Sequence, residues 1–136
     1  MILVDTNVVI DILTNNARWA DWSGARLSEA AGVTAINIVV VAELSKGFAS
    51  LDALRHMMAK LGLVVEAMDE TVAFLAGQRF LSYRRSRADD TIQRVLPDFF
   101  LGAHASMLGC PLLTRDRRLY RSYFPDLTLI TPETDA

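Results

Sequence analysis

A chain of 136 residues and 15.1 kDa is the size of one domain, 1–136, and can bury a hydrophobic core without disulfide bonds or a structural metal. Its 51% hydrophobic and 22% charged residues exclude a disordered chain, and its longest charge-free stretches are shorter than a bilayer span, so we expect no membrane segment. The formal net charge of −2 does not exclude a nucleic-acid partner, because residues 79–136 carry nine Lys or Arg against seven Asp or Glu.

The predicted elements alternate between short apolar strands and helices. Up to residue 68, apolar runs, caps and glycine stops predict strands 2–4, 33–36 and 63–65 and helices 8–13, 17–31, 38–46 and 51–61. Further along they predict helices 69–85 and 97–108, strands 111–114 and 127–130, a charged loop at 84–90 and a connection at 115–124. Short apolar strands interleaved with helices are typical of parallel strands buried on both faces. The pattern therefore predicts an α/β fold with a mostly parallel sheet between helical layers.

Four acidic residues occur where the surrounding sequence is apolar. Asp5 follows the first predicted strand, and Glu43 lies in an almost wholly apolar helical segment. Asp98 precedes two phenylalanines and a leucine, and Asp116 follows the strand at 111–114. Carboxylates beside a core must be paired or bind a cation. Ligands of parallel sheets bind at the carboxyl ends of the strands, where Asp5 and Asp116 lie. Because clustered anions are tolerable only with a cation or shared protons, we expect the four carboxylates to converge on a shared metal position.

Each acid also has a purely structural explanation. Asp5 and Asp98 can be helix N-caps, Asp116 can be a turn residue, and Glu43 can be an exposed residue of an amphipathic helix. Glu43 fits this explanation least well, because valines three and four residues before it lie on the same helix face. Mg²⁺ and Mn²⁺ prefer such oxygen ligands and can activate water for attack on phosphorus, so the chemistry needs no nucleophilic side chain.

Four segments of the chain, taken together, resemble a known family. They are Leu3-Val4-Asp5-Thr6-Asn7, Val41-Ala42-Glu43-Leu44, the segment 96–105 and the segment 113–120. In order, spacing and context they resemble the PIN-domain family, and within it the VapC-type toxins of toxin–antitoxin systems, over nearly the whole chain. The resemblance implies a three-layer α/β/α sandwich with a five-stranded sheet and a ribonuclease that depends on Mg²⁺ or Mn²⁺. It also implies a homodimer and a VapB-like antitoxin partner.

The resemblance further implies roles for individual residues. The metal ligands and catalytic acids would be Asp5, Glu43, Asp98 and Asp116. Thr6 and Asn7 resemble the polar residues after the first acid, and Thr114 resembles the hydroxyl residue that orients the catalytic water or the last acid. The arginines near the last acid suit a track for RNA phosphates, and the candidate contacts are Arg115, Arg117 and Arg118. The position of Arg115 varies in the family.

Other classes of protein fit the sequence less well. A catalytically silent PIN-fold module that binds RNA or a partner would not need all four acids. A haloacid-dehalogenase-like phosphatase has a second Asp where this chain has Asn7, and a receiver domain has a Lys in the last loop, where this chain has Arg115 and Asp116. One cysteine and no basic segment at the N-terminus agree with a cytoplasmic location. We therefore predict a cytoplasmic endoribonuclease, the toxin of a type II pair.

A few residues are assigned outside the acidic site. We interpret His56 and His104 as structural, because neither has a catalytic partner at a suitable spacing, and we expect Cys110, beside Pro111, to be buried and unreactive. Trp19 and Trp22 lie three residues apart on a predicted helix, where they can pack in the core or form a groove for a partner.

Overall fold

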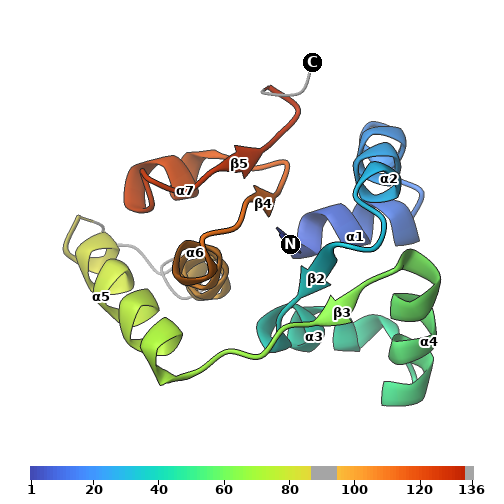
Figure 1. Cartoon of the computed structure of the whole chain (residues 1–136), viewed down its shortest axis with the longest axis horizontal. Coiled ribbons are helices and arrows are strands. Elements are labelled where there is room, and N and C mark those ends of the chain that lie inside the picture. Colours follow the sequence, from blue (N-terminus) through green and yellow to red (C-terminus); the bar gives the residue numbers. More distant parts are fainter. Residues whose placement is uncertain (87–94, 134–136) are drawn as a thin grey trace.

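The centre of the fold is a five-stranded sheet (Figure 1). In the computed structural model, which describes residues 1–86 and 95–133, the strands are β1 (Ile2–Val4), β2 (Thr34–Ile36), β3 (Val64–Val65), β4 (Leu112–Leu113) and β5 (Leu129–Ile130). Their order is β3-β2-β1-β4-β5, and every neighbouring pair is parallel. The predicted strands are confirmed, and the sheet is wholly parallel.

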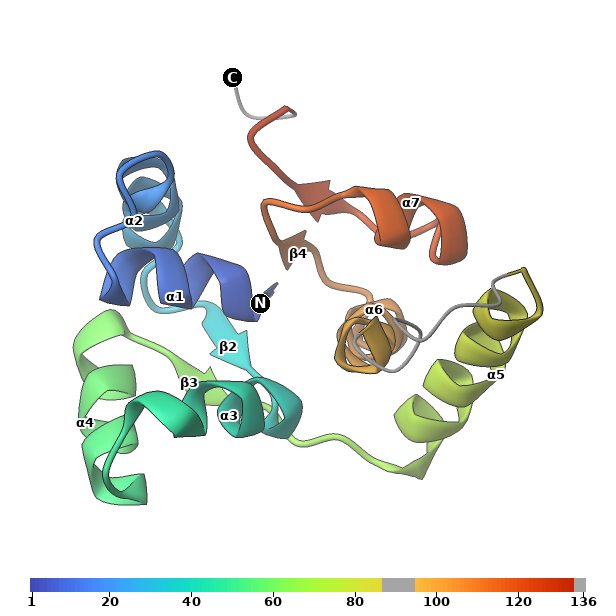
Figure 2. The same ribbon diagram turned by 180° about the vertical axis from the view of Figure 1, so that it is seen from behind.

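Helices cover both faces of this sheet. They are α1 (Thr6–Leu13), α2 (Ala20–Glu29), α3 (Ile38–Leu44), the 3₁₀ turn η1 (Ser45–Gly47), α4 (Leu51–Leu61), α5 (Glu70–Ser86), α6 (Leu96–Leu108) and α7 (Arg118–Tyr123). Figures 1 and 2 show α1, α2 and α4 on one side of the sheet and α5, α6 and α7 on the other. This is the three-layer α/β/α arrangement that the resemblance implies.

The chain order creates a switch point beside β1. From β1 the chain moves outward to β2 and β3, and it then crosses to β4 and β5 on the other side of β1. Open parallel sheets bind ligands at such a switch point, outside the carboxyl ends of the two strands. The residues that directly follow β1 and β4 are Asp5 and Thr114.

Local signals explain most helix boundaries. The side chain of Asn37 caps α3 by accepting hydrogen bonds from the N–H groups of Val39 and Val40 at 3.0 and 3.1 Å. Gly62 and Gly109 end α4 and α6 in the left-handed conformation, which glycine adopts without strain. The predicted helices are present, with α2 beginning at Ala20 rather than at residue 17.

Two predictions for the second half of the chain need correction. The loop expected at 84–90 is helical as far as Ser86, and residues 87–90 lie outside the described residues. The connection 115–124 contains α7, a short polar helix whose buried Tyr120 packs with Phe124 on the core. Gly102 in α6 allows this approach, since a Cβ atom there would lie 2.5 Å from the Phe124 ring. Within residues 1–86 and 95–133, no helix combines the length and apolar character of a membrane span.

Candidate functional site

The four predicted acids lie on elements that meet at the switch point. Asp5 directly follows β1, and Asp116 lies three residues after β4. Glu43 lies in α3 and Asp98 in the first turn of α6, and these two helices pack against each other. Asp5 is buried, Glu43 and Asp98 are half-buried, and Asp116 is exposed. The exposure of the four acids therefore increases from Asp5 at the end of β1 to Asp116 at the solvent.

Asp5 is held by hydroxyl groups from the far end of the chain. Its Oδ2 atom accepts hydrogen bonds from Thr114 Oγ1 at 2.8 Å and from the Tyr120 hydroxyl at 2.9 Å. Burial raises the pKa of Asp5, the Thr114 and Tyr120 hydrogen bonds oppose this shift, and the charge of Glu43 adds to it. Two hydroxyl donors thus replace part of the water that this carboxylate lacks.

The charges of the other three acids contribute to the pKa of Asp98. Its Oδ1 atom lies 3.5 Å from the Tyr120 hydroxyl. Burial, and then the charges of Asp5, Glu43 and Asp116, raise the pKa of Asp98 to about 8. Burial and the nearby carboxylates also hold the pKa of Tyr120 well above its usual value, so this hydroxyl remains a donor. The four acids therefore share one electrostatic environment.

Glu43 and Asp116 are each oriented by a nearby threonine. Thr6 Oγ1 donates a hydrogen bond to Glu43 Oε1 at 2.6 Å, which joins the start of α1 to α3. The Asp116 N–H donates to Thr114 Oγ1 at 3.1 Å, and Asp116 Oδ1 accepts from the N–H of Arg118 at 3.3 Å. Asp116 is therefore a turn residue, as its structural explanation predicts. Its second carboxylate oxygen has no hydrogen bond in the described structure.

The donor set fits a hard divalent cation. Among the described residues, no Lys or Arg forms an ion pair with any of the four acids. Mg²⁺ keeps several waters and is commonly held by only one or two carboxylates. Asp5 and Asp98, which both lie within 3.5 Å of the Tyr120 hydroxyl, satisfy that requirement. A cation there would offset the repulsion that raises the pKa of Asp98.

The four acids differ in the direction that their side chains take in the structure. In the part of the chain that the structure describes, no three acidic, histidine or cysteine side chains surround one point closely enough to hold an ion as they lie. Asp5 and Asp98 meet at Tyr120, whereas Glu43 is turned to Thr6 and Asp116 lies at the exposed rim. Convergence on a single metal position by all four acids stays a prediction.

Sequence reasoning missed Tyr120, which contacts the acids, and Asp11, which pairs with Arg115 beside them. The contact of Tyr120 with Asp5 spans 115 residues, so no local pattern reveals it. Asp11 is 1% exposed and forms an ion pair with Arg115, with Arg115 Nε 2.7 Å from Asp11 Oδ2 and Arg115 Nη2 3.0 Å from Asp11 Oδ1. Spacing could have revealed Asp11, because it follows the buried Val8 by three residues on α1 and so lies on the buried face of the helix.

The predicted RNA contacts differ in their surroundings. Arg115 is engaged by Asp11, so its contact with RNA stays a prediction beside an ion pair that the structure shows. Arg118 is exposed, and Arg117 Nε lies 3.9 Å from Glu133 Oε1. A pocket of about 740 Å³ opens next to the acids, and its lining includes Asp98, Asp116, Arg117, Arg118, Arg121 and Tyr123.

Among the residues assigned outside the site, His104 and Cys110 are buried, whereas His56 is exposed on α4. His104 is buried, with Nε2 3.0 Å from the Ala67 carbonyl and Nδ1 3.3 Å from Asn37 Nδ2, and burial lowers its pKa. Cys110 is buried as well, and burial raises the pKa of its thiol. Trp22 packs against the core and meets Trp19 edge to face at 6.5 Å. A groove for a partner at these tryptophans stays a prediction.

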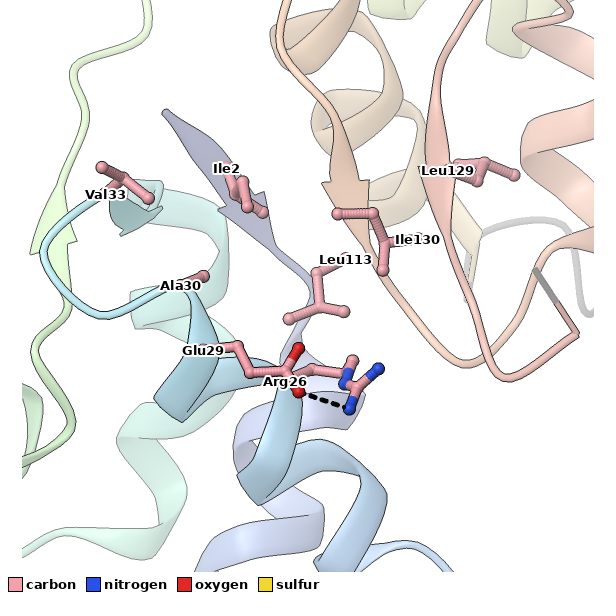
Figure 3. Close-up of a pocket in the computed structure, with 8 residues that line it drawn as sticks. All are labelled: Ile2, Arg26, Glu29, Ala30, Val33, Leu113, Leu129 and Ile130. Atoms are coloured by element: carbon pink, nitrogen blue, oxygen red, sulfur yellow. Dashed lines mark hydrogen bonds and ion pairs between the residues drawn. The ribbon is translucent and has the colours of Figure 1, made fainter. Parts of the chain in front are cut away.

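A second pocket lies away from the acids (Figure 3). It has a volume of about 530 Å³ and is bounded by α2, β4 and β5, with apolar side chains such as Leu113, Leu129 and Ile130. At its edge Arg26 and Glu29 form an ion pair of 2.8 Å. This pocket shares no residue with the acidic site.

Fold and site define an α/β protein with an acidic centre at the switch point of a parallel sheet. The family model of the PIN domain matches residues 2–125, and the chain belongs to the PIN domain family. PIN domains of toxins are generally nucleases, and PIN nucleases generally use divalent metal ions.

Several solved structures that resemble this chain are toxin–antitoxin complexes or their DNA-bound forms. A toxin–antitoxin complex from Klebsiella pneumoniae is 21% identical, with a TM-score of 0.65 over 97% of this chain and 98% of that chain. VapBC2 from Rickettsia felis, bound to a DNA fragment from its promoter, is 18% identical, with a TM-score of 0.68 over 96% and 98%. FitAcB from Neisseria gonorrhoeae is 22% identical, with a TM-score of 0.66 over 98% and 99%. No curated protein matches the chain.

Proposed function

We propose that this protein is a metal-dependent endoribonuclease that acts as the toxin of a type II toxin–antitoxin pair. The observation that carries the proposal is the meeting of Asp5 and Asp98 within 3.5 Å of the buried Tyr120 hydroxyl, with no Lys or Arg paired to either acid among the described residues. A cluster of carboxylates at the switch point destabilises the fold through desolvation and repulsion unless it binds a cation. The proposed catalytic residues are Asp5, Glu43, Asp98, Asp116 and Thr114. The four acids would hold Mg²⁺ or Mn²⁺.

In this proposal the acids hold the metal ion and two threonines orient the acids. Bound Mg²⁺ or Mn²⁺ supplies Lewis acidity and makes water a better nucleophile toward a phosphodiester at neutral pH. Asp5 and Asp98 are the inner ligands, since both lie beside Tyr120. Thr114 orients Asp5, and Thr6 orients Glu43. Asp116 at the rim would contribute its free carboxylate oxygen to holding the cation.

RNA would enter through the pocket of about 740 Å³ beside Asp98 and Asp116. Arg117 and Arg118 line this pocket, and arginine binds phosphate through a planar fork of N–H donors. A cationic wall next to the acids would bring the RNA backbone to the metal position despite the net charge of −2.

An antitoxin partner is the second part of the proposal. An apolar groove of about 410 Å³, lined by Ile10, Leu13, Leu44 and Phe48, runs up to Glu43. A VapB-like antitoxin that fills this groove would reach the acidic site and block it. A homodimer is proposed as well, and α5 offers an exposed apolar face for it with Phe74 and Leu81. Expression of the chain alone should slow growth, and the antitoxin should relieve this effect.

A cleavage assay tests the catalytic part. Purified protein is mixed with a structured RNA pool and Mg²⁺ or Mn²⁺, with chelator and with the Asp98→Asn variant as controls. We expect cleavage by the wild type that stops in both controls. If metal-loaded wild-type protein binds RNA without cutting it, the chain is a silent PIN-fold binding module instead. Cleavage that persists in the Asp98→Asn variant would assign the activity to other residues or to a contaminant.

A further inference from the structure

The ion pair between buried Asp11 and half-buried Arg115 joins α1 to the segment that carries Thr114 and Asp116. We infer that this ion pair is a positioning device for the metal site, so that Asp11 and Arg115 act through Thr114 and Asp116. The inference rests on the proposed function, because it concerns the site at which that function would occur. It replaces RNA contact as the main role of Arg115.

The contacts fix the guanidinium of Arg115 in one orientation. Its Nε and Nη2 atoms donate to the two oxygens of Asp11 at 2.7 and 3.0 Å. Ser23 Oγ in α2 donates to Asp11 Oδ2 at 3.1 Å, and the Arg115 guanidinium lies 5.8 Å from the centre of the Trp19 ring. A bidentate pair of this kind constrains direction as well as distance.

The backbone of the same segment is held by the same face of α1. Asn7 and Asp11 are four residues apart, so both side chains lie on one face of the helix. Asn7 Oδ1 accepts the N–H of Arg115 at 3.4 Å, and Asn7 Nδ2 donates to Thr114 Oγ1 at 3.3 Å. Both the backbone and the side chain of Arg115 are therefore fastened to α1.

The residues on either side of Arg115 contact the acids directly. Thr114 Oγ1 donates to Asp5 at 2.8 Å and accepts the N–H of Asp116 at 3.1 Å. A rotation of this segment would move the Thr114 hydroxyl away from Asp5 and would displace Asp116 from the rim. The Asp11–Arg115 pair opposes that rotation by holding the Arg115 side chain against α1.

A contribution to stability alone explains the pair poorly. The ion pair must offset the loss of hydration of the fully buried Asp11 carboxylate and of part of the Arg115 guanidinium, and apolar residues of similar size often pack as well or better at such a position. Contact with RNA also explains Arg115 poorly, because two of its donor groups face Asp11 and its side chain is only 31% exposed. A bidentate pair fixes the direction of the Arg115 side chain, and a fixed direction is what the orientation of Thr114 and Asp116 requires.

The test measures Mn²⁺ affinity without RNA, then kcat and KM with RNA. Arg115→Lys keeps the charge and loses the fork, and Asp11→Asn/Arg115→Gln removes both charges so that neither is left unpaired. Partners that orient metal ligands change affinity or activity by about 10- to 100-fold, so we expect weaker Mn²⁺ binding and lower kcat of that size in both variants, with KM changed less than kcat. The control is Glu29→Gln, which breaks the 2.8 Å ion pair at the pocket in Figure 3 and should change neither quantity.

Four outcomes would overturn the inference. If Arg115 contacts RNA, Arg115→Lys will raise KM and leave Mn²⁺ affinity unchanged. If the pair is only structural, the melting temperature will fall while Mn²⁺ affinity and kcat of the folded protein stay at the wild-type level. If the wild type neither binds Mn²⁺ nor cuts RNA, the proposed function fails and takes the inference with it, whereas wild-type behaviour in both variants refutes the inference alone.

Discussion

Tyr120 donates a 2.9 Å hydrogen bond to the carboxylate of Asp5, and this bond ties the short helix α7 to the end of β1. Tyr120 is 2% exposed and Asp5 is 4% exposed, so water cannot easily take the place of either partner. Within the described residues, Asp5 has no positively charged partner, and its other short hydrogen bond comes from Thr114. The stability of the metal-free protein should therefore depend on this hydroxyl.

Tyr120→Phe removes the donor and keeps the ring. The buried carboxylate of Asp5 then loses one of its two short hydrogen bonds, which should lower the free energy of unfolding by about 1–3 kcal/mol. Urea denaturation in chelator measures the change. Tyr123→Phe is the matched control, because the Tyr123 hydroxyl contacts Ser86 at 3.0 Å at the surface and its loss should cost less than about 0.5 kcal/mol. Equal effects of the two substitutions would contradict a special role of Tyr120.

Asp98→Asn should abolish metal-dependent cleavage without weakening the metal-free fold. The substitution removes a proposed ligand, and it also removes a carboxylate that burial and three neighbouring anions destabilise when it is charged. The metal-free variant should therefore be at least as stable as the wild type at pH 8 in urea denaturation. Asp52→Asn on the exposed start of α4 should keep full cleavage. A marked loss of stability in Asp98→Asn would mean that the Asp98 carboxylate is held by favourable contacts instead.

The same pKa predicts how stability changes with pH. Asp98 titrates near its ordinary value of 3.8 in the unfolded chain and at about 8 in the folded protein. Between these values the folded state binds more protons, so the free energy of unfolding falls as the pH rises. This destabilisation is absent below pH 3.8, grows toward pH 8 and is complete above it.

Metal-free wild type should therefore lose stability relative to Asp98→Asn between pH 5 and pH 8, and added Mg²⁺ should restore most of it at pH 8. Thermal unfolding of both proteins across this range, with and without Mg²⁺, measures the difference. Parallel pH profiles for the two proteins would show that Asp98 is not protonated in the folded state.

The sequence predicts the fold and the acids for different reasons. Short apolar strands between helices already define a parallel sheet, and Asp5, Glu43 and Asp98 are conspicuous because their neighbours are apolar. Helix α7 escapes prediction because its sequence is short and polar, and packing of Tyr120 and Phe124 on the core stabilises it. Contacts between residues far apart in the chain, such as Thr6 with Glu43, depend on the folded arrangement and leave no local pattern.

The arginines beside Asp116 should determine RNA affinity more than the net charge does. Arg117 and Arg118 line the pocket next to Asp98 and Asp116, and the only ion pair of either in the described residues is the 3.9 Å contact of Arg117 with Glu133. Each phosphate contact releases counterions, so removal of two contacts should flatten the dependence of log Kd on log salt by roughly one to two units. Arg117→Ala/Arg118→Ala should therefore bind all RNA sequences more weakly and cut normally at saturating RNA.

A salt titration of RNA binding measures this effect, with Ca²⁺ in place of Mg²⁺ or in the Asp5→Asn background so that no RNA is cut. The matched control is Arg55→Ala/Lys60→Ala, which removes two cations from the exposed surface of α4 and changes the net charge equally. Because α4 is not part of the acidic site, this control should keep the wild-type slope. If both double variants flatten the slope to the same extent, RNA binding follows the overall charge. An unchanged slope in Arg117→Ala/Arg118→Ala would mean that neither arginine contacts phosphate, and the RNA path would then run elsewhere.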